Sequence, residues 1–176
     1  MFQIWMLIAA AGLVGLDQWT KYLAAEYLTQ PIPLWPGVFE LQYCENRGVA
    51  FGMLQGQRWI FIPLTLVVVA VLLVMLFRSE WRRSRVFSVS AALIIAGGIG
   101  NLIDRIFHGF VTDFLYFKLI DFPIFNVADC YVTVGAVLLF VYLLFLNKGS
   151  EDKPLLTVLF GIPARTKAQD THGTDH

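Results

Sequence analysis

The chain has 176 residues, of which 57% are hydrophobic and 15% charged, with 13 basic residues balancing 13 acidic ones. This composition lies outside the range of soluble globular proteins and predicts one compact membrane domain. The zero net charge gives no reason to expect a nucleic-acid partner. Two distant cysteines without CxxC spacing exclude a disulfide framework or a zinc site as the leading hypothesis.

Four long apolar runs follow one another along the chain, at residues 2–23, 60–77, 86–107 and 127–146. Each is close to the ~20 residues that a helix needs to cross a hydrocarbon core of ~30 Å. The sequence therefore predicts an all-α membrane protein with four transmembrane helices. The first run has no basic residue before it and carries Asp17 and Lys21 at its far end, so we expect it to be retained rather than cleaved as a leader.

The connections between these runs differ in charge. The segment RSEWRRSR, residues 78–85, holds four arginines, whereas residues 24–59 hold only Arg47 and Arg58. By the positive-inside rule the arginine-rich connection is cytoplasmic, and both termini then face the cytoplasm. Residues 1–148 form the predicted membrane domain, and residues 149–176 form a polar cytoplasmic tail to which we assign no chemistry.

The connection between the first two helices has a strand pattern. In residues 39–43 apolar and polar side chains alternate, Asn46 to Gly48 provide a turn, and residues 49–51 form a possible returning strand. We expect a small extracytoplasmic β-sheet within about residues 30–56, lying on the outer membrane surface.

Polar groups of the predicted helices gather near the outer leaflet. Asp17 and Lys21 are spaced i, i+4 on the first helix, and on the third helix steps of four, three and four residues form one polar stripe. Ionisable groups inside a membrane usually mark a functional site or an internal ion pair. The stripe consists of Gly97, Asn101, Asp104 and His108, with Arg105 beside it.

Several of these residues have a purely structural alternative. Asp17 with Lys21, and Asp104 with Arg105, could be ion pairs that hold the bundle together. Asp129 could be an acid at the start of the fourth helix, capped by Asn126.

Three further patterns favour a structural interpretation. The Gly97 to Gly100 run lies inside a span and indicates close helix packing rather than a phosphate site. Cys130 with His108 could form a thiol nucleophile and its base, but a cysteine that opens an apolar run is usually a packing residue. Asp121 is most simply a solvated loop residue beside Lys118.

Asp113 has no structural alternative of this kind. It follows the third helix by a few residues, and Asp129 opens the fourth helix on the same side of the membrane. Two carboxyl groups within a few Å in a low-dielectric site share a proton, so that one is neutral and the other anionic. Such a pair can activate water and protonate a leaving amine, which is peptide hydrolysis without a metal or other cofactor.

Five short motifs carry a resemblance to a known family. In chain order they are DQWTK, ENRGVAFG, GGIGNLIDR, GFVTDF and FNVAD. Together, on four spans, they resemble the lipoprotein signal peptidases (signal peptidase II), bacterial membrane aspartic peptidases, over about residues 5–146.

This resemblance implies a function. The catalytic pair would be Asp113 and Asp129, and the enzyme would cleave diacylglyceryl-modified prolipoproteins before the lipidated cysteine. It also implies a monomer in the bacterial cytoplasmic (inner) membrane, with its active site near the extracytoplasmic face, membrane lipids around it, and inhibition by globomycin. The outer sheet would be the substrate cradle. Residues implied to support the site are Asp17, Lys21, Asn46, Gly48, Asn101, Asp104, Arg105 and Asn126.

Val49 departs from the family pattern, which more often has alanine there, and could narrow substrate preference.

Two other classes of protein remain open on the residues alone. One is a proton-coupled transporter or channel subunit that uses the carboxylates as a relay, although ionisable residues are missing from the middle of the third span. The other is a non-catalytic assembly factor whose polar residues bind partner helices.

Overall fold

The computed structural model describes residues 1–48, 58–78 and 84–146. Val49, the expected strand at 49–51, most of the arginine-rich connection and the tail from 149 lie outside this part of the chain. The described elements in chain order are α1 (Phe2–Tyr27), β1 (Ile32–Trp35), β2 (Phe39–Asn46), α2 (Arg58–Phe77), α4 (Arg85–Phe107), β3 (Val111–Tyr116), the 3-10 turn η2 (Lys118–Ile120), α5 (Val127–Val141) and the π-helical turn η3 (Tyr142–Leu146).

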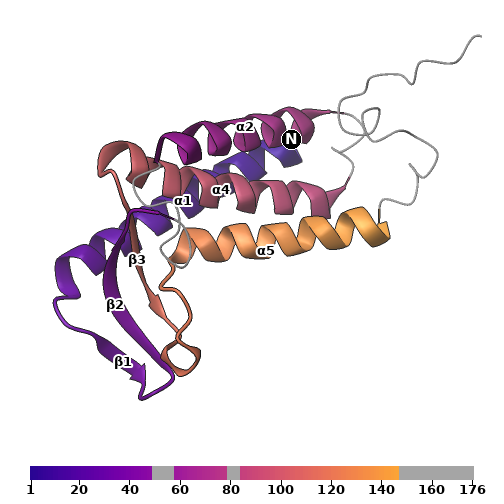
Figure 1. The fold of residues 1–176 in the computed structure, drawn as a ribbon. Helices are drawn as coiled ribbons and strands as arrows, with labels where there is room; N and C mark the ends of the chain where they lie inside the picture. Colours follow the sequence, from indigo (N-terminus) through magenta and orange to yellow (C-terminus); the bar gives the residue numbers. More distant parts are fainter. Residues whose placement is uncertain (49–57, 79–83, 147–176) are drawn as a thin grey trace, which may run out of the picture.

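Four of the helices, α1, α2, α4 and α5 with its π-helical extension, are long and apolar enough to cross a membrane. Their bounds agree with the predicted runs, except that α1 continues to Tyr27. In Figure 1 the start of α1, the end of α2, the start of α4 and the end of α5 lie at one end of the bundle. The sheet lies at the opposite end.

Helix α4 is the centre of the bundle. It packs against α1, α2 and α5, and 56% of its span is buried, against 17–22% of the others. Its N-terminus is capped by Ser84, whose hydroxyl accepts the Phe87 backbone N–H at 3.2 Å. Its first half belongs to an apolar core in which Phe87 and Leu76 are fully buried beside Tyr142.

Small residues bring α4 and α5 close together, as the Gly97 to Gly100 run predicted. A methyl group added at Gly97 would lie 2.7 Å from Val132 Cγ2, and one at Gly135 would lie 2.8 Å from Ile94 Cγ1. Real side chains do not approach so closely, so these two helices pack at glycine distance.

Among the described residues, the sheet has three antiparallel strands in the order β1-β2-β3. The expectation that it would be formed between the first two helices alone was therefore incomplete, because its third strand follows α4 and carries Asp113. Gly109 makes this possible: with φ +81°, it ends α4 and redirects the chain into β3. Pairing of Asn46 with Val111 and of Cys44 with Asp113 sets the register of β2 and β3.

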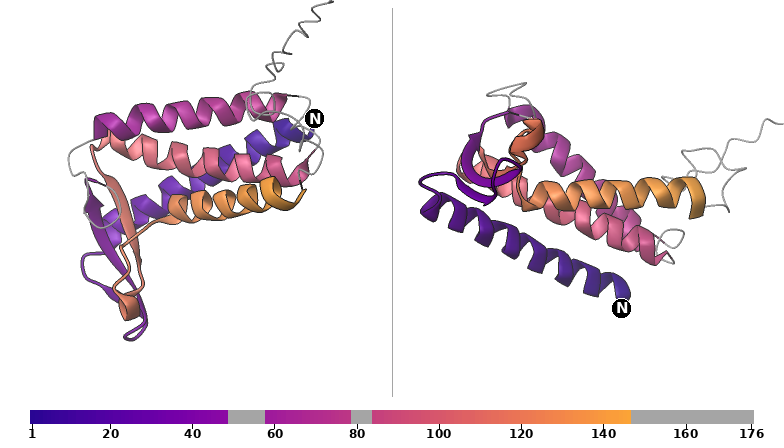
Figure 2. Two further views of the ribbon diagram at one scale, coloured as in Figure 1. Left: turned by 45° about the vertical axis from the view of Figure 1, so that its right-hand side comes forward. Right: turned by 90° about the horizontal axis from the view of Figure 1, so that it is seen from below.

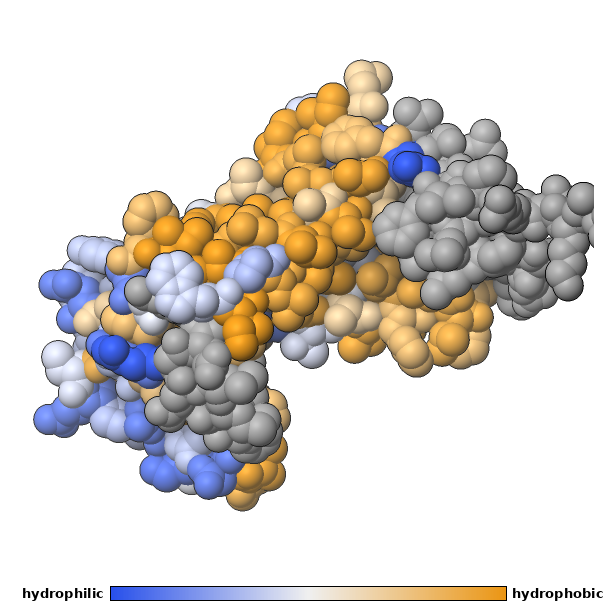
Figure 3. All heavy atoms as spheres, turned by 45° about the horizontal axis from the view of Figure 1, so that its top comes forward, coloured by the Kyte–Doolittle hydropathy of each residue, from blue (hydrophilic) through white to orange (hydrophobic). Residues whose placement is uncertain are grey.

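The sheet projects beyond the side of the helical bundle, as the left view in Figure 2 shows. In the surface of Figure 3, hydrophobic residues cover the helical part and hydrophilic residues gather over the sheet end. Five buried polar residues lie where these two regions meet, and this junction holds the predicted site: Asp17, Lys21, Asp104, Asp113 and Asn126.

Candidate active site

Asp113 lies on β3 and is almost fully buried, with 1% of its surface exposed. Its two carboxylate oxygens accept amide N–H groups from different segments: Oδ2 from Asn46 Nδ2 at 2.8 Å and Oδ1 from Asn126 Nδ2 at 2.7 Å. Burial, and then the negative charge of Asp129, raises the pKa of Asp113 to about 7, although both amide hydrogen bonds and Lys21 oppose the rise. Asp113 therefore exchanges a proton near neutral pH.

Asp129 is the third residue of α5 and closes a capping box. The Asn126 side chain accepts the Asp129 backbone N–H at 2.9 Å, and Asp129 Oδ2 accepts the Asn126 backbone N–H at 3.1 Å. The structural alternative for Asp129 is thus confirmed. The cap occupies only one oxygen of the Asp129 carboxylate. The other oxygen, Oδ1, turns toward α4 and accepts Asn101 Nδ2 at 2.7 Å.

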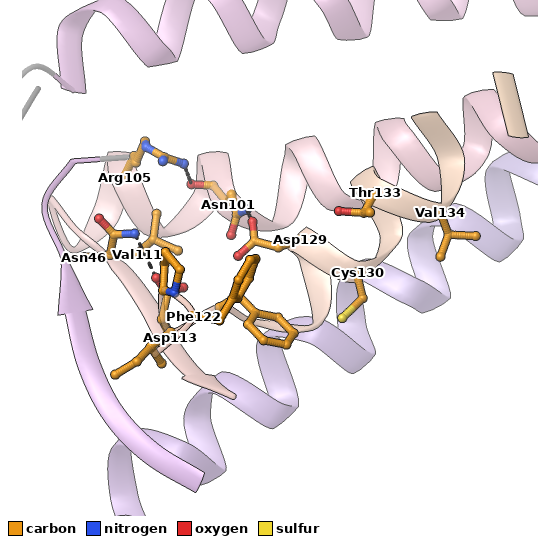
Figure 4. A pocket seen from close by; sticks show the side chains of 13 residues that line it. Asn46, Asn101, Arg105, Val111, Asp113, Phe122, Asp129, Cys130, Thr133 and Val134 are labelled. Atoms are coloured by element: carbon orange, nitrogen blue, oxygen red, sulfur yellow. Dashed lines mark hydrogen bonds between the residues drawn. The ribbon is translucent and has the colours of Figure 1, made fainter. Parts of the chain in front are cut away.

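Two asparagine amides connect the two aspartates. Asn126 donates to Asp113 and also to Asn101 Oδ1 at 3.0 Å, and Asn101 in turn donates to Asp129. In the part of the chain that the structure describes, the carboxyl groups are joined through these amides and not by a direct hydrogen bond. Both side chains face one cavity (Figure 4).

Lys21 is a buried cation close to the Asp113 and Asp129 site, with 3% of its surface exposed. Its ammonium group contacts Asp17 Oδ2 at 2.9 Å, Asp104 Oδ2 at 3.1 Å and Asn101 Oδ1 at 2.9 Å. The predicted ion pair between Asp17 and Lys21 is confirmed.

The alternative pair of Asp104 with Arg105 is wrong. Neighbouring residues of a helix point about 100° apart, so Asp104 turns inward to Lys21. Arg105 instead donates to the Asn101 carbonyl at 3.2 Å and lies over the Phe61 ring at 5.4 Å.

Asp17 and Asp104 also bind backbone groups. Asp17 Oδ1 accepts the backbone N–H of Ala128 at 2.9 Å, and Asp104 Oδ2 accepts that of Thr112 at 3.0 Å. Gln18, which lies inside the DQWTK motif but was not singled out, donates to both carboxylates at 3.2 and 3.1 Å. The side chains of Asp17, Asp104 and Gln18 therefore belong to one hydrogen-bonded cluster.

Gly48 supports the site through Asn46. Its backbone N–H donates to Asn46 Oδ1 at 3.0 Å, which leaves the Asn46 amino group to reach Asp113. Six of the predicted supporting side chains join the same hydrogen-bonded system as the two aspartates: Asn46, Asn101, Asn126, Lys21, Asp17 and Asp104.

The cavity in front of the aspartates has a volume of about 530 Å³. One wall is the segment 122–125 and another is the α5 face beyond Asp129, and sequence reasoning identified neither. Aromatic stacking of Phe125 on Phe117, with ring centroids 5.8 Å apart, holds the 122–125 segment in place. The lining residues are Asn46, Asn101, Arg105, Val111, Asp113, Phe122, Pro123, Ile124, Phe125, Asp129, Cys130, Thr133 and Val134.

The other candidate groups lie apart from this chemistry. Cys130 lines the cavity, but His108 is exposed at the end of α4 and packs against Phe110 at 6.0 Å, so the thiol and imidazole are not a pair. Asp121 is an exposed loop residue that accepts the Tyr116 hydroxyl at 2.5 Å. Across the described ranges, no three His, Cys, Asp or Glu residues are grouped as metal ligands.

Comparison with known proteins gives a consistent result. The model of the family described as signal peptidase (SPase) II matches residues 9–145. The lipoprotein signal peptidase of Streptococcus thermophilus is 45% identical over 146 residues, covering 82% of this chain and 95% of that protein. The one from Brevibacillus brevis is 45% identical over 138 residues, covering 77% and 92%.

A solved structure has the same fold. It is a bacterial membrane enzyme determined by the in meso method at 2.3 Å resolution, and it aligns with a TM-score of 0.73 and 28% identity. The alignment covers 85% of this chain and 92% of that one. The four helices and the sheet therefore belong to a fold already observed in a membrane enzyme.

Proposed function

The chain belongs to the signal peptidase II family, and on that premise we propose that it removes signal peptides from lipid-modified prolipoproteins by aspartic catalysis at Asp113 and Asp129. The bond cleaved is the peptide bond before the diacylglyceryl-modified cysteine. The supporting residues are those of the hydrogen-bonded system around the pair.

One observation carries the proposal. Two carboxyl groups that are 16 residues apart in sequence face one cavity, on two different elements, and amides from three segments hold them. Buried carboxyl groups with a perturbed pKa in a cavity are typical of catalytic sites. The proton affinity of Asp113 near neutral pH is the property that an acid of such a pair needs.

We assign the proton at neutral pH to Asp113 and the negative charge to Asp129. A water molecule between them attacks the scissile carbonyl carbon and gives one proton to Asp129, while Asp113 gives its proton to the carbonyl oxygen. The tetrahedral gem-diol then collapses: its C–N bond breaks as the proton on Asp129 passes to the leaving amine, and one gem-diol hydroxyl returns its proton to Asp113 as the carboxylic acid product forms. One water is consumed, and the two carboxyl groups together again hold one proton.

The fold suits a substrate that is anchored in lipid. The cavity begins at the junction of sheet and helices and continues along α5 past Cys130 to Val134, whose side chain is half exposed at the helix surface. A lipidated cysteine that keeps its acyl chains in the bilayer would hold the scissile bond at the depth of Asp129. Positioning then requires no extraction of the substrate from the membrane.

We place the sheet and both aspartates on the extracytoplasmic face of the bacterial inner membrane, with both termini in the cytoplasm. Support comes from the arginine-rich connection at residues 78–85, which lies between helices that end and begin at the end of the bundle remote from the sheet. The working unit is a monomer with β2 and β3 as the substrate cradle. A globomycin-type inhibitor would occupy the same cavity.

The test is turnover of a lipidated prolipoprotein peptide by Asp113→Asn and Asp129→Asn variants of the full chain. Each variant keeps the size of the side chain and one acceptor oxygen, although one of its two N–H partners loses an acceptor. Because the amide cannot exchange a proton, we expect turnover to fall by about 10⁴-fold or more. Asp121→Asn is the matched control, because the same change at an exposed loop residue should leave turnover intact. Turnover retained by a folded Asp113→Asn or Asp129→Asn variant would reject the aspartic pair.

A further inference from the structure

The buried Lys21 contacts three acceptors, and each of them leads to one of the two aspartates. The three acceptors are Asp17, Asp104 and Asn101, at 2.9, 3.1 and 2.9 Å from the ammonium nitrogen. An ammonium group has three N–H donors, so all of them are used. A single carboxylate would be enough to neutralise the charge of Lys21, so its bonds to three different side chains indicate a further role.

The first path runs from Lys21 through Asp17 to α5. Asp17 Oδ1 accepts the backbone N–H of Ala128, the residue before Asp129, at 2.9 Å, although the two residues are 111 positions apart in sequence. Asn126 satisfies the next N–H of the same turn. Asp17 is therefore a second cap of α5, supplied by α1, and it fixes the turn that carries Asp129.

The second path runs from Lys21 through Asp104 to β3. Asp104 Oδ2 accepts the backbone N–H of Thr112, the residue before Asp113, at 3.0 Å. The two paths are thus equivalent: in each, a buried carboxylate bound to Lys21 holds the peptide group directly before an aspartate of the pair.

The third path runs through side chains. Asn101 accepts Lys21 with its oxygen and donates to Asp129 Oδ1 at 2.7 Å. Because the same oxygen also accepts Asn126, which donates to Asp113, the orientation of this amide is coupled to both carboxyl groups.

We propose that Lys21 is a positioning residue that fixes the distance and orientation between Asp113 and Asp129, by holding Asp17, Asp104 and Asn101 around one buried cation. This inference rests on the proposed function. A strand of the sheet and a helix of the bundle would otherwise carry the two aspartates independently. Displacement of a catalytic group by about 1 Å lowers the rate by about 100-fold.

Two substitutions separate positioning from charge compensation. Lys21→Met removes both the charge and the three contacts, whereas Lys21→Arg keeps a cation but replaces the compact ammonium with a longer planar group. Positioning predicts a fall in kcat of about 100-fold for both variants, with KM changed less than about threefold. A role in charge compensation alone predicts a Lys21→Arg variant with nearly full kcat.

Lys118→Met is the matched control. Lys118 also forms an ion pair, with Glu40 at 3.0 Å, but it is half exposed and lies outside the buried cluster. Its partner Glu40 is buried, so we expect a lower midpoint of thermal unfolding. The kcat of Lys118→Met should stay within about twofold of that of the unmodified chain, because this pair does not include Asp17, Asp104 or Asn101.

The measurements are kcat and KM with a lipidated peptide, and the midpoint of thermal unfolding, on the full chain in detergent. A Lys21→Arg variant that unfolds at the normal temperature and turns over at the normal rate would overturn the proposal. Should Lys21→Met not fold, Asp17→Asn and Asp17→Leu decide instead, because asparagine still accepts the Ala128 N–H and leucine does not. Positioning predicts a kcat at least tenfold higher in Asp17→Asn than in Asp17→Leu, and equal kcat values would contradict it.

Failure of this inference is distinguishable from failure of the proposed function. Lys21 variants with normal kcat, beside inactive Asp113→Asn and Asp129→Asn variants, would reject only the positioning role. Active Asp113→Asn and Asp129→Asn variants would reject the aspartic mechanism itself.

Discussion

At the end of the bundle remote from the sheet, the large fully buried side chains are Phe87 and Leu76, and the buried hydroxyls of Ser88 and Ser90 bond carbonyls one turn earlier in the chain. At the sheet end, the fully buried side chains are Asp17, Asp104, Asp113 and Asn126. Apolar side chains gain little from leaving lipid for a helix interface, so the first region depends on shape and close packing. Buried polar groups must find partners, so the second depends on a specific set of hydrogen bonds. The apolar end should therefore control stability, and the polar end activity.

The largest effect expected on stability is at Phe87. Phe87→Ala leaves a cavity in the apolar core where α2, α4 and Tyr142 meet, and should lower the free energy of unfolding by about 3 kcal/mol. Turnover per folded molecule should not change. Unfolding in detergent, measured together with turnover of the lipidated peptide, checks both parts, and a variant of normal stability that is inactive would break the comparison.

At the polar end, the largest effect expected is from Gly100→Ala. The added methyl would collide with the Asp17 carboxylate and lie 3.3 Å from Ala128 Cβ, so the carboxylate that caps the first turn of α5 must shift. We expect kcat to fall by about 100-fold.

Gly98→Ala is the control for that change, on the same helix and two residues away. Its methyl would meet Thr65 and Val69 at 3.4 and 3.5 Å, which is ordinary contact. Turnover should remain normal and stability should rise slightly, because alanine favours the helix. Equal loss of activity in both variants would show that the position of α4, and not the contact with Asp17, is what matters.

The pH dependence of turnover tests the role of Asp113. Since its pKa is raised to about 7 and we assign it the transferable proton, kcat/KM should fall by about tenfold per pH unit as pH rises above about 7. Asn46 donates to the Asp113 carboxylate and so lowers its pKa. Asn46→Ala should move this alkaline limb to higher pH; activity that instead increases through pH 7 would make Asp113 the base.

The smallest effect is expected at Tyr131, on the border between the two regions. Its hydroxyl is buried and, within the described part of the chain, has no hydrogen-bond partner, next to the alanine-rich contact of α1 and α4. Tyr131→Phe removes this unsatisfied group and should stabilise the fold by about 1 kcal/mol without changing turnover. A loss of stability in thermal unfolding would show that the hydroxyl has a partner in the membrane.

The spans and the level of the polar residues were predictable because both follow from local patterns. Apolar runs of sufficient length indicate helices, and the steps from Gly97 to Asp104 place side chains on one face whatever the rest of the chain does. The cap at Asn126 was predictable for the same reason.

The missed features depend on contacts distant in sequence. β3, with the sequence VTDFLY, does not alternate apolar and polar side chains, and it is stabilised by pairing with a strand that precedes it by more than 60 residues. The partner of Asp104 was mistaken because Arg105 is its neighbour in sequence, whereas Lys21 is its neighbour in space. The side chains of Asp17 and Asp104 bind backbone N–H groups. Because nearly every residue has such a group, the sequence does not indicate which residue is the partner.

The capping box of α5 has a consequence for inhibition and resistance. One oxygen of Asp129 closes the first turn of the helix and the other is held by Asn101, so this carboxylate is rigid before any ligand arrives. A compound shaped to that fixed geometry would lose little entropy in ordering its target. Substitution of Asp129 would remove a contact that starts the helix together with the proposed catalytic group, so resistance to such a compound through this position should cost both stability and turnover.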